Sequence, residues 1–299
     1  MKLSTFDLFK KMPPGADEAE LSNEELTALQ NTLFEILSDI KKVCEQHNLC
    51  YFLVGGSAIG ALRHGGFIPW DDDLDICMPR ADYNKFVPLF QNEFKNKYYV
   101  ETPENTKGYL LLLTKVRKLG TVLRGRDDLS AERCGIGVDV FVVENTPNNA
   151  FLRKLHGFGS MALSYILSCR KFYKYKKQML CYASRVEGAE KVFKRKIRIG
   201  FVAAAFGNIN FWRRLANGWN KLCKNNNSTY VTPAAGSFGY FKETYKRSEF
   251  CKTRTEVFCG ADVEVPVGAE KYLTRCYGDW QTVPPVEKRE KHFVLEFKA

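Results

Sequence analysis

CYFLVGGSAIGALRHGGFIPWDDDLDI, residues 50–76, contains two short apolar segments, a pair of glycines and a dense group of carboxylates. Residues 50–54 are apolar or aromatic and read as a short buried strand that leads into Gly55 and Gly56. Ser57 and a helical segment over 58–63 follow. A strand, a glycine pair and a helix start together form a cradle whose backbone N–H groups can bind an anion such as a phosphate.

The second half of this stretch carries four carboxylates within five residues, at Asp71, Asp72, Asp73 and Asp75. Apolar residues at 74 and 76 alternate with Asp73 and Asp75, which predicts a strand that places these two carboxylates on one side. Carboxylates at this density repel one another, and a divalent cation, usually Mg²⁺ shared with substrate phosphates, neutralises them. A solvated acidic turn is the alternative. The flanking strand pattern favours the metal.

The segment 135–143 is the most strand-like of the chain, with β-branched and aromatic residues around one carboxylate, Asp139. An unpaired Asp inside such a strand is costly to bury. It therefore caps a turn, faces solvent on an edge strand, or joins a metal site. We favour the metal site, because Asp139 supplies the third carboxylate that Asp73 and Asp75 lack.

A second strand is predicted within residues 110–118, where alternation places Leu113, Lys115 and Arg117 on one face. Such a basic face is more often a solvated edge than a phosphate clamp. A helix is predicted over 23–47, because Ser22 and Glu25 form a capping box before an apolar face at helical spacing. Short strands return over 256–258 and 262–266.

These elements predict an α/β protein with a mixed sheet, divided into three parts. Residues 1–150 form the core with its N-terminal helix, 151–227 form a helical, basic and aromatic insertion, and 228–299 complete the core. The insertion either lies on a membrane surface or packs on the core as a lid with a solvated basic face.

Composition limits the possible partners. The chain has 299 residues with 45 Lys and Arg against 34 Asp and Glu, a net charge of +11, which suits phosphorylated substrates, membrane surfaces or nucleic acid. None of the ten cysteines has the spacing of a zinc ribbon or redox motif, which favours a reducing compartment. No apolar run approaches the roughly 18 residues of a membrane-spanning helix, so we expect a soluble or peripheral protein.

Three motifs in order carry a resemblance to a known family. They are Gly55-Gly56-Ser57, the run from Arg63 to Asp75, and Tyr277-Gly278-Asp279-Trp280 followed by Pro284-Pro285. With them the chain resembles the LicD phosphocholine transferase family, to which fukutin-related proteins also belong. The resemblance covers about residues 25–145 and 228–292. The chain departs from the family pattern at Ser57 and Ala58, where Thr and Leu are common, but a hydroxyl is retained at the first of these positions.

The resemblance implies a nucleotidyltransferase-like core that transfers phosphocholine, or a similar phospho-alcohol, from a CDP-alcohol to a hydroxyl of a cell-surface glycan precursor. CMP would leave, and the acceptor would belong to lipopolysaccharide, teichoic acid or capsule. The implied cofactor is Mg²⁺, with Mn²⁺ as a substitute, held by Asp73, Asp75 and Asp139. Asp72, or Asp71, would support this site or act as general base. The donor phosphates would be bound by six residues: Gly55, Gly56, Ser57, Arg63, Lys115 and Arg117.

Two other functions remain open on the residues alone. The first is a true nucleotidyltransferase that releases pyrophosphate. The second is a non-catalytic protein that binds an anionic membrane or nucleic acid through its net charge. Three carboxylates within a basic chain argue against the second, and we expect no nucleic-acid partner. The expected location is the cytoplasm, with peripheral contact at the inner face of the cytoplasmic membrane.

Overall fold

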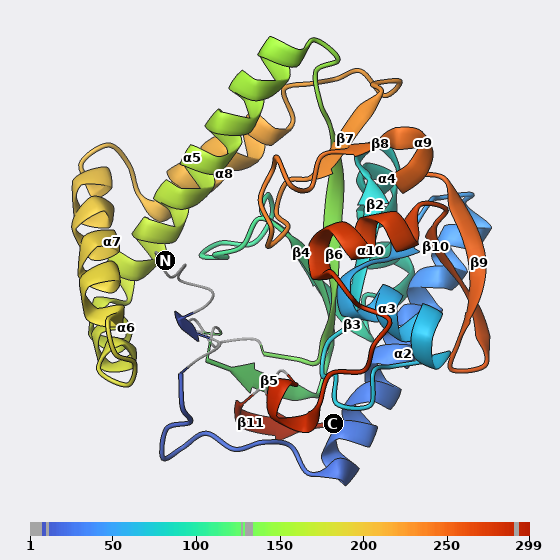
Figure 1. Cartoon of the computed structure of the whole chain (residues 1–299), viewed down its shortest axis with the longest axis horizontal. Helices are drawn as coiled ribbons and strands as arrows, with labels where there is room; N and C mark the ends of the chain where they lie inside the picture. The colour runs from blue at the N-terminus through green and yellow to red at the C-terminus, as the bar shows by residue number, and fades with distance from the viewer. Residues whose placement is uncertain (1–7, 10–11, 127, 129–133, 290–292) are drawn as a thin grey trace.

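The fold is described from a computed structural model of the chain, which describes residues 8–9, 12–126, 128, 134–289 and 293–299. A mixed sheet forms its centre (Figure 1). The strand order is β1-β2-β6-β4-β3. At the C-terminal end of β6, β7 pairs with β6 and β8 pairs with β7. Their bounds are β1 Phe52–Leu53, β2 Asp75–Pro79, β3 Tyr98–Glu101, β4 Thr114–Lys118, β6 Gly137–Asn145, β7 Tyr230–Pro233 and β8 Tyr245–Lys246. The predicted α/β class with a mixed sheet is confirmed.

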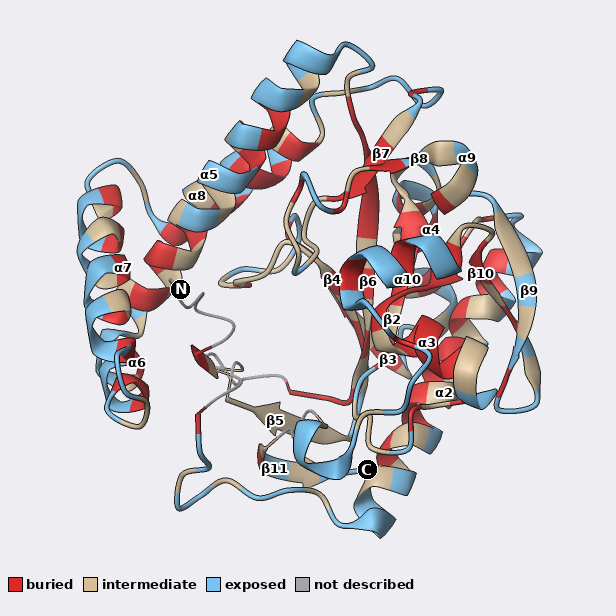
Figure 2. Ribbon diagram, viewed as in Figure 1, coloured by how far each residue is buried: buried red, intermediate tan, exposed pale blue. Residues whose placement is uncertain are grey.

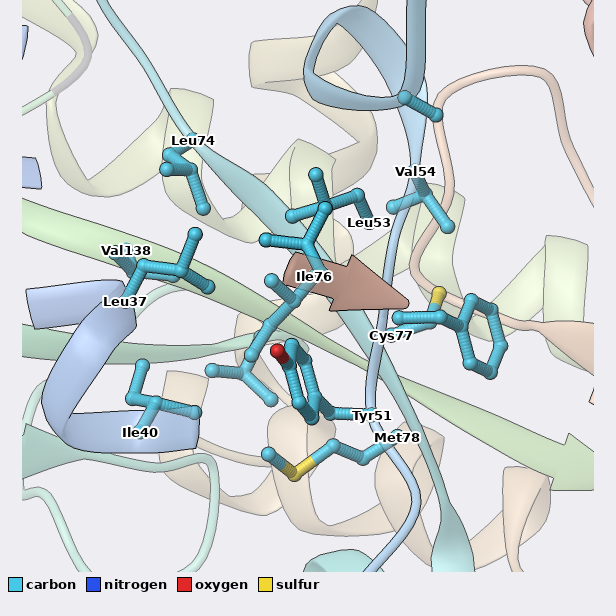
Figure 3. Close-up of a cluster of buried hydrophobic side chains, with 14 of the residues drawn as sticks. Leu37, Ile40, Tyr51, Leu53, Val54, Leu74, Ile76, Cys77, Met78 and Val138 are labelled. Carbon is cyan, nitrogen blue, oxygen red and sulfur yellow. The ribbon is translucent and has the colours of Figure 1, made fainter. Parts of the chain in front are cut away.

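One face of the sheet is covered by two helices, α2 (Asn23–Gln46) and α4 (Arg80–Phe94). The predicted capping box of α2 is present, since Glu25 N–H donates to Ser22 Oγ and Ser22 N–H donates to the Glu25 carboxylate. Figure 3 shows Leu37 and Ile40 of α2 near Ile76 of β2 and Val138 of β6. These four side chains are at most 1% exposed. Even-numbered residues of β6 therefore point into this apolar layer, which sends Asp139 to the opposite face.

Smaller elements flank the sheet. The predicted helix after the glycines begins earlier than expected, as α3 (Gly55–His64), and α10 (Ala269–Tyr277) lies beside it. The predicted strands near 256 and 262 are β9 (Thr253–Phe258) and β10 (Ala261–Pro266), an antiparallel pair. The short α9 (Arg247–Phe250) precedes them, and a second pair, β5 (Val122–Gly125) with β11 (Val294–Lys298), was not predicted.

The segment predicted to be a helical insertion is helical. It comprises α5 (Ala150–Lys174), α6 (Lys176–Ala183), α7 (Ala189–Ala204) and α8 (Ile209–Asn220). Figure 1 shows these helices beside the sheet rather than within its layers. Two N-terminal residues, Leu8 and Met12, pack with Phe172, Met179 and Phe193 in a small separate core. Leu8 and Met12 therefore pack with the insertion rather than with the sheet.

Candidate active site

A row of charged side chains crosses three neighbouring strands on the face of the sheet opposite α2. Asp75 of β2 is the register partner of Asp139 of β6, which is in turn the partner of Lys115 of β4. The Asp139 N–H donates to the Leu74 carbonyl over 2.9 Å and fixes this register. Because register partners project from the same side of a sheet, the three side chains lie next to one another. The predicted proximity of Asp139 and Asp75, 64 residues apart in sequence, is confirmed.

Lys115 forms an ion pair with Asp139, with 2.7 Å between Nζ and Oδ1. The two side chains are 21% and 18% exposed, so water screens the pair only in part. Burial would lower the pKa of Lys115, but the Asp139 carboxylate outweighs it and the pKa is raised. Lys115 is therefore a fixed positive charge in the row. The predicted placement of Lys115 and Arg117 on one face of β4 is also confirmed, since Arg117 is the register partner of Gly137.

Asp75 is the most strongly perturbed carboxyl of the row. Burial raises its pKa well above the ordinary value, and the negative charges of Asp73, Asp139 and Asp71 raise it further, while Lys115 opposes them. A single lysine does not neutralise this group of carboxylates. Carboxylate oxygens are the ligands that Mg²⁺ and Mn²⁺ prefer, so the donor set fits a divalent cation bound at Asp75, Asp139 and their acidic neighbours.

The acidic run before β2 forms a compact group. Carboxylate oxygens of Asp71, Asp72 and Asp73 lie within 4.8 Å of one another. The prediction that a strand already includes Asp73 is wrong, because β2 begins at Asp75. The alternation of Asp73 and Asp75 along one strand therefore does not exist. It is the loop 71–74 that brings Asp73 close enough to Asp75 to raise its pKa.

The glycine pair lies directly beside these carboxylates. Gly55 has φ +59°, a left-handed conformation that favours glycine, and a Cβ added there would meet Asp75 Oδ2 at 3.1 Å. A Cβ on Gly56 would lie 2.6 Å from Asp71 Oδ2. Ser57 Oγ accepts a hydrogen bond from the Asp75 N–H over 2.8 Å. The glycines therefore allow the start of α3 to approach the acidic group, and Ser57 ties that start to β2.

Several predicted phosphate-binding residues are engaged in other contacts. The Gly55 N–H donates to the Tyr272 hydroxyl over 2.5 Å. Arg63 donates to the backbone carbonyls of Trp280 and Thr282, which attaches α3 to the segment after α10. Arg117 is 5% exposed and donates to the Glu101 carboxylate over 2.8 Å and to the Gly135 carbonyl over 2.8 Å. Lys115, by contrast, lies in the row. The structure thus assigns structural contacts to Arg63 and Arg117, and their role toward phosphate stays a prediction.

Tyr277 lies closer to the acidic row than its sequence position indicated. Its hydroxyl would be 3.4 Å from a Cβ on Gly55. Burial raises the pKa of this hydroxyl, and the charge of Asp75 raises it further. The ring itself is exposed and contacts Phe238 edge-on at 5.2 Å. The signal in the sequence was the Tyr277-Gly278-Asp279-Trp280 motif, but its aromatic neighbour Trp280 is buried and Asp279 instead caps a turn at Thr282.

The described helices include none that is both long enough and apolar enough to cross a membrane.

Comparison with known proteins shows which family this chain is similar to. Residues 48–154 match the family model described as LicD/FKTN/FKRP, nucleotidyltransferase domain. The chain is 27% identical over 273 residues to the lipopolysaccharide cholinephosphotransferase LicD of Haemophilus influenzae. The aligned region covers 89% of this chain and 95% of that protein. Uncharacterized proteins of Rickettsia typhi and Rickettsia prowazekii are 33% and 37% identical over 63 residues, about 20% of this chain. The predicted resemblance is confirmed, since residues 48–154, which contain the whole Asp75–Asp139–Lys115 row, match the nucleotidyltransferase domain of the LicD family.

Proposed function

We propose that this protein transfers phosphocholine, or a similar phospho-alcohol, from a CDP-alcohol to a hydroxyl of a cell-surface glycan precursor, with release of CMP. The observation that carries the proposal is the row of Asp75, Asp139 and Lys115 beside a glycine turn. Similarity over most of the chain to a lipopolysaccharide cholinephosphotransferase supports this reaction and a lipopolysaccharide acceptor, ahead of teichoic acid or capsule.

Magnesium, with manganese as a substitute, would be held by Asp75, Asp139 and Asp73, and Asp71 lies near enough to join them. When bound, the metal would neutralise charge on the diphosphate of the donor. The first turn of α3 would face the same phosphates, because Gly55 and Gly56 permit close approach there.

The protein's own groups would then divide the work of transfer. Lys115 would offset negative charge on the phosphoryl group from the side opposite α3. The acceptor oxygen would form a new bond to the choline-bearing phosphorus as the bond from that phosphorus to the CMP oxygen breaks. Asp72 would take the proton of the acceptor hydroxyl. The exposed ring of Tyr277 beside Asp75 offers an aromatic face for the quaternary ammonium of choline.

The direct test is CMP release by the purified protein with Mg²⁺ and a series of CDP-alcohols carrying choline, ethanolamine, glycerol or ribitol. We expect release with at least one donor, and loss of release in Asp75→Asn. The matched control is Asp262→Asn, an exposed carboxylate on β10. Pyrophosphate release from a nucleoside triphosphate would instead identify a true nucleotidyltransferase. Failure to release either product, with no effect of Asp75→Asn on ligand binding, would leave only a non-catalytic anion-binding role.

Peripheral membrane contact through the insertion is part of this proposal. Residues 150–224 contain 17 Lys and Arg against 2 Glu, a net charge of +15, while the rest of the chain has 28 basic and 32 acidic residues, a net charge of −4. Large apolar side chains recur along the same helices with high exposure, including Phe151 (74%), Leu155 (54%) and Phe158 (64%) of α5. Their spacing of four and three residues forms one stripe, and Figure 2 shows exposed residues along the length of α5.

An apolar stripe within a basic region fits the cytoplasmic face of an anionic membrane. We expect the protein to sediment with vesicles that contain phosphatidylglycerol but not with pure phosphatidylcholine vesicles. Replacement of Phe151, Leu155 and Phe158 by Ser should abolish sedimentation. Replacement of the exposed Val257 of β9 by Ser should not. A dimer in solution that the triple substitution dissociates would contradict membrane contact and assign the stripe to a second copy.

A further inference from the structure

A large cavity lies at the edge of the sheet, next to the acidic row but outside it. Its volume is about 950 Å³. It is lined by β3, by the loop 105–111 that leads to β4, and by the last turn of α5 with Tyr175. The residues that matter below are Glu101, Tyr109, Arg117, Lys171, Lys174 and Tyr175. None of the functions assigned above uses this cavity.

The cavity is connected with the acidic row through β3. Glu101 of β3 is the register partner of Lys115, so the row continues as Asp75, Asp139, Lys115 and Glu101 across four strands. Adjacent strands are about 4.8 Å apart, which places Glu101 about 10 Å from Asp139. The donor phosphates are proposed to bind at the glycine turn beside Asp75, at the other end of this row. The cavity therefore lies across Asp139 from the donor.

Tyr109 links the cavity to Asp139. The residue is 7% exposed, lines the cavity, and among the described residues its hydroxyl has no hydrogen-bond partner. Burial raises the pKa of this hydroxyl, and Asp139 is the charged group that raises it most. A buried hydroxyl without a partner is costly, and a ligand in the cavity would supply the missing partner.

The loop that carries Tyr109 is held from outside by the insertion. Arg213 of α8 donates to the carbonyl oxygens of Thr106 and Tyr109 over 2.7 and 2.8 Å. Asn217 of α8 donates to Glu104 over 2.7 Å. These contacts fix the loop backbone before any ligand binds. The insertion thus shapes the cavity both through α8 and through the end of α5.

Among the described residues of the cavity wall, basic side chains outnumber acidic ones. The Arg117 guanidinium is neutralised by Glu101 and by Asp128, at 2.8 and 3.3 Å. The lysines on its wall, Lys95, Lys107, Lys171 and Lys174, then leave an excess of positive charge. Tyr99, Tyr109 and Tyr175 also line this wall, whereas the Tyr98 ring packs on Phe90 and Phe94 in the core. Flat aromatic faces pack against the C–H face of a sugar ring, and lysines bind its phosphate or carboxylate groups.

We propose that this cavity is the acceptor site and takes an anionic carbohydrate, a glycan segment bearing phosphate or carboxylate groups. Lys171 and Lys174 bind the anionic groups, and Tyr109 is a positioning residue that holds the acceptor hydroxyl next to Asp139. This inference rests on the proposed transfer reaction. It assigns the helical insertion a second role, in which the end of α5 selects the acceptor.

The test uses the full chain and core oligosaccharide prepared from lipopolysaccharide by deacylation, which removes any membrane effect. One sample keeps its phosphates and a second has them removed with aqueous hydrogen fluoride. Binding is measured by calorimetry without donor, and transfer by CMP release from CDP-choline. The variants are the double substitution Lys171→Ala with Lys174→Ala, and Tyr109→Phe. The matched control is Lys176→Ala with Lys177→Ala, two exposed lysines on α6 outside the cavity wall.

The lysine double variant should weaken binding of the phosphorylated oligosaccharide, and raise its KM, by about tenfold or more, because two charge-assisted contacts are lost. The control pair should change neither quantity, and the dephosphorylated sample should bind weakly to all variants. Tyr109→Phe should lower kcat for transfer about tenfold while acceptor-independent hydrolysis of CDP-choline is unchanged. Its melting temperature should not fall, whereas a merely structural tyrosine would lower it.

Several outcomes would overturn the inference. A rise in KM for CDP-choline, with unchanged oligosaccharide binding, would make the cavity a donor site. Absence of oligosaccharide binding by the unmodified protein, or equal binding by the lysine double variant, would remove the acceptor site altogether. Oligosaccharide binding that the double variant loses, in a protein that releases no CMP from any CDP-alcohol, would refute the proposed reaction and keep the site.

Discussion

Substitution of Asp75 by Asn should separate two effects of the acidic row: the loss of stability caused by repulsion between its carboxylates, and the binding of a metal by these carboxylates. The substitution keeps the shape of the side chain and removes one negative charge. In the absence of metal, burial and the charges of Asp73, Asp139 and Asp71 disfavour ionised Asp75. We therefore expect metal-free Asp75→Asn to melt at the same temperature as the unmodified protein or higher.

Magnesium should stabilise the unmodified protein far more than the Asp75→Asn variant. A ligand present at 100 times its dissociation constant stabilises the folded state by about 2.7 kcal/mol. Unfolding entropy near the melting temperature is about 2.1 cal/mol/K per residue, or about 0.6 kcal/mol/K for a chain of this length, so the melting temperature should rise by about 4 °C. Asp75→Asn should lose most of this rise because it removes a ligand at the centre of the row.

The assay is calorimetric or fluorescence-monitored melting at fixed pH and ionic strength, with MgCl₂ titrated against NaCl of equal ionic strength. Asp262→Asn, on the exposed side of β10, is the control and should keep the full rise. Two results would refute the reasoning. One is an equal magnesium response in Asp75→Asn, which would place the metal elsewhere. The other is a marked loss of metal-free stability, which would show that Asp75 is held by stabilising contacts.

Three further predictions concern the surroundings of the row. Burial raises the pKa of Glu243 to about 7. The stabilising contribution of this carboxyl is therefore fully present below the ordinary carboxyl pKa and is lost as pH rises through about 7. Glu243→Gln should remove up to about 3 kcal/mol of this pH dependence, measured by urea unfolding between pH 5 and 8. Gly56→Ala should weaken magnesium binding, since its Cβ would meet Asp71 Oδ2 at 2.6 Å and displace this carboxylate, at a cost of only about 1 kcal/mol in stability because the end of a side chain can shift. Gly218→Ala, with open space around it in α8, should stabilise by about 1 kcal/mol in the same melts. Arg117→Ala should lower the free energy of unfolding in urea by about 3 kcal/mol, because it leaves Glu101 and Asp128 without their ion-pair partner. A variant of unchanged stability with a raised KM for the donor would instead show that Arg117 binds the donor phosphates.

The parts of the fold that follow from local sequence could be predicted. The capping box at Ser22 and Glu25 fixes the start of α2, and it forms as expected. The strand predicted within residues 110–118 is present as β4, Thr114–Lys118, which alternates between buried and half-buried residues over its first three positions. The glycine pair also predicted a close approach between backbone and anionic groups, although the groups it meets in the structure are the protein's own carboxylates.

The side-chain partners of the arginines could not be predicted, because they are set by contacts distant in sequence. Arg63 donates to carbonyl groups 217 and 219 residues away, and no local pattern encodes that pairing. The strand β4 does predict which face Arg117 occupies, but the carboxylates that neutralise it come from β3 and from Asp128 after β5. Tyr109 was missed for the same reason. It lies in a loop whose position depends on α8, about a hundred residues later.

The distribution of charge along the chain fits the proposal that one protein binds a metal, a cationic headgroup and an anionic acceptor. The net charge of +11 is misleading as a property of the whole, because residues 150–224 carry +15 and the remainder carries −4. An acidic row that binds metal and faces a quaternary ammonium would be weakened by a basic core, since charges within about 8 Å act on one another at physiological salt. The excess of positive charge lies on α5, α6, α7 and α8, which stand beside the sheet rather than within its layers (Figure 1). Only the end of α5, with Lys171 and Lys174, is brought to the cavity beside the row, which is where an anionic acceptor would have to meet the donor.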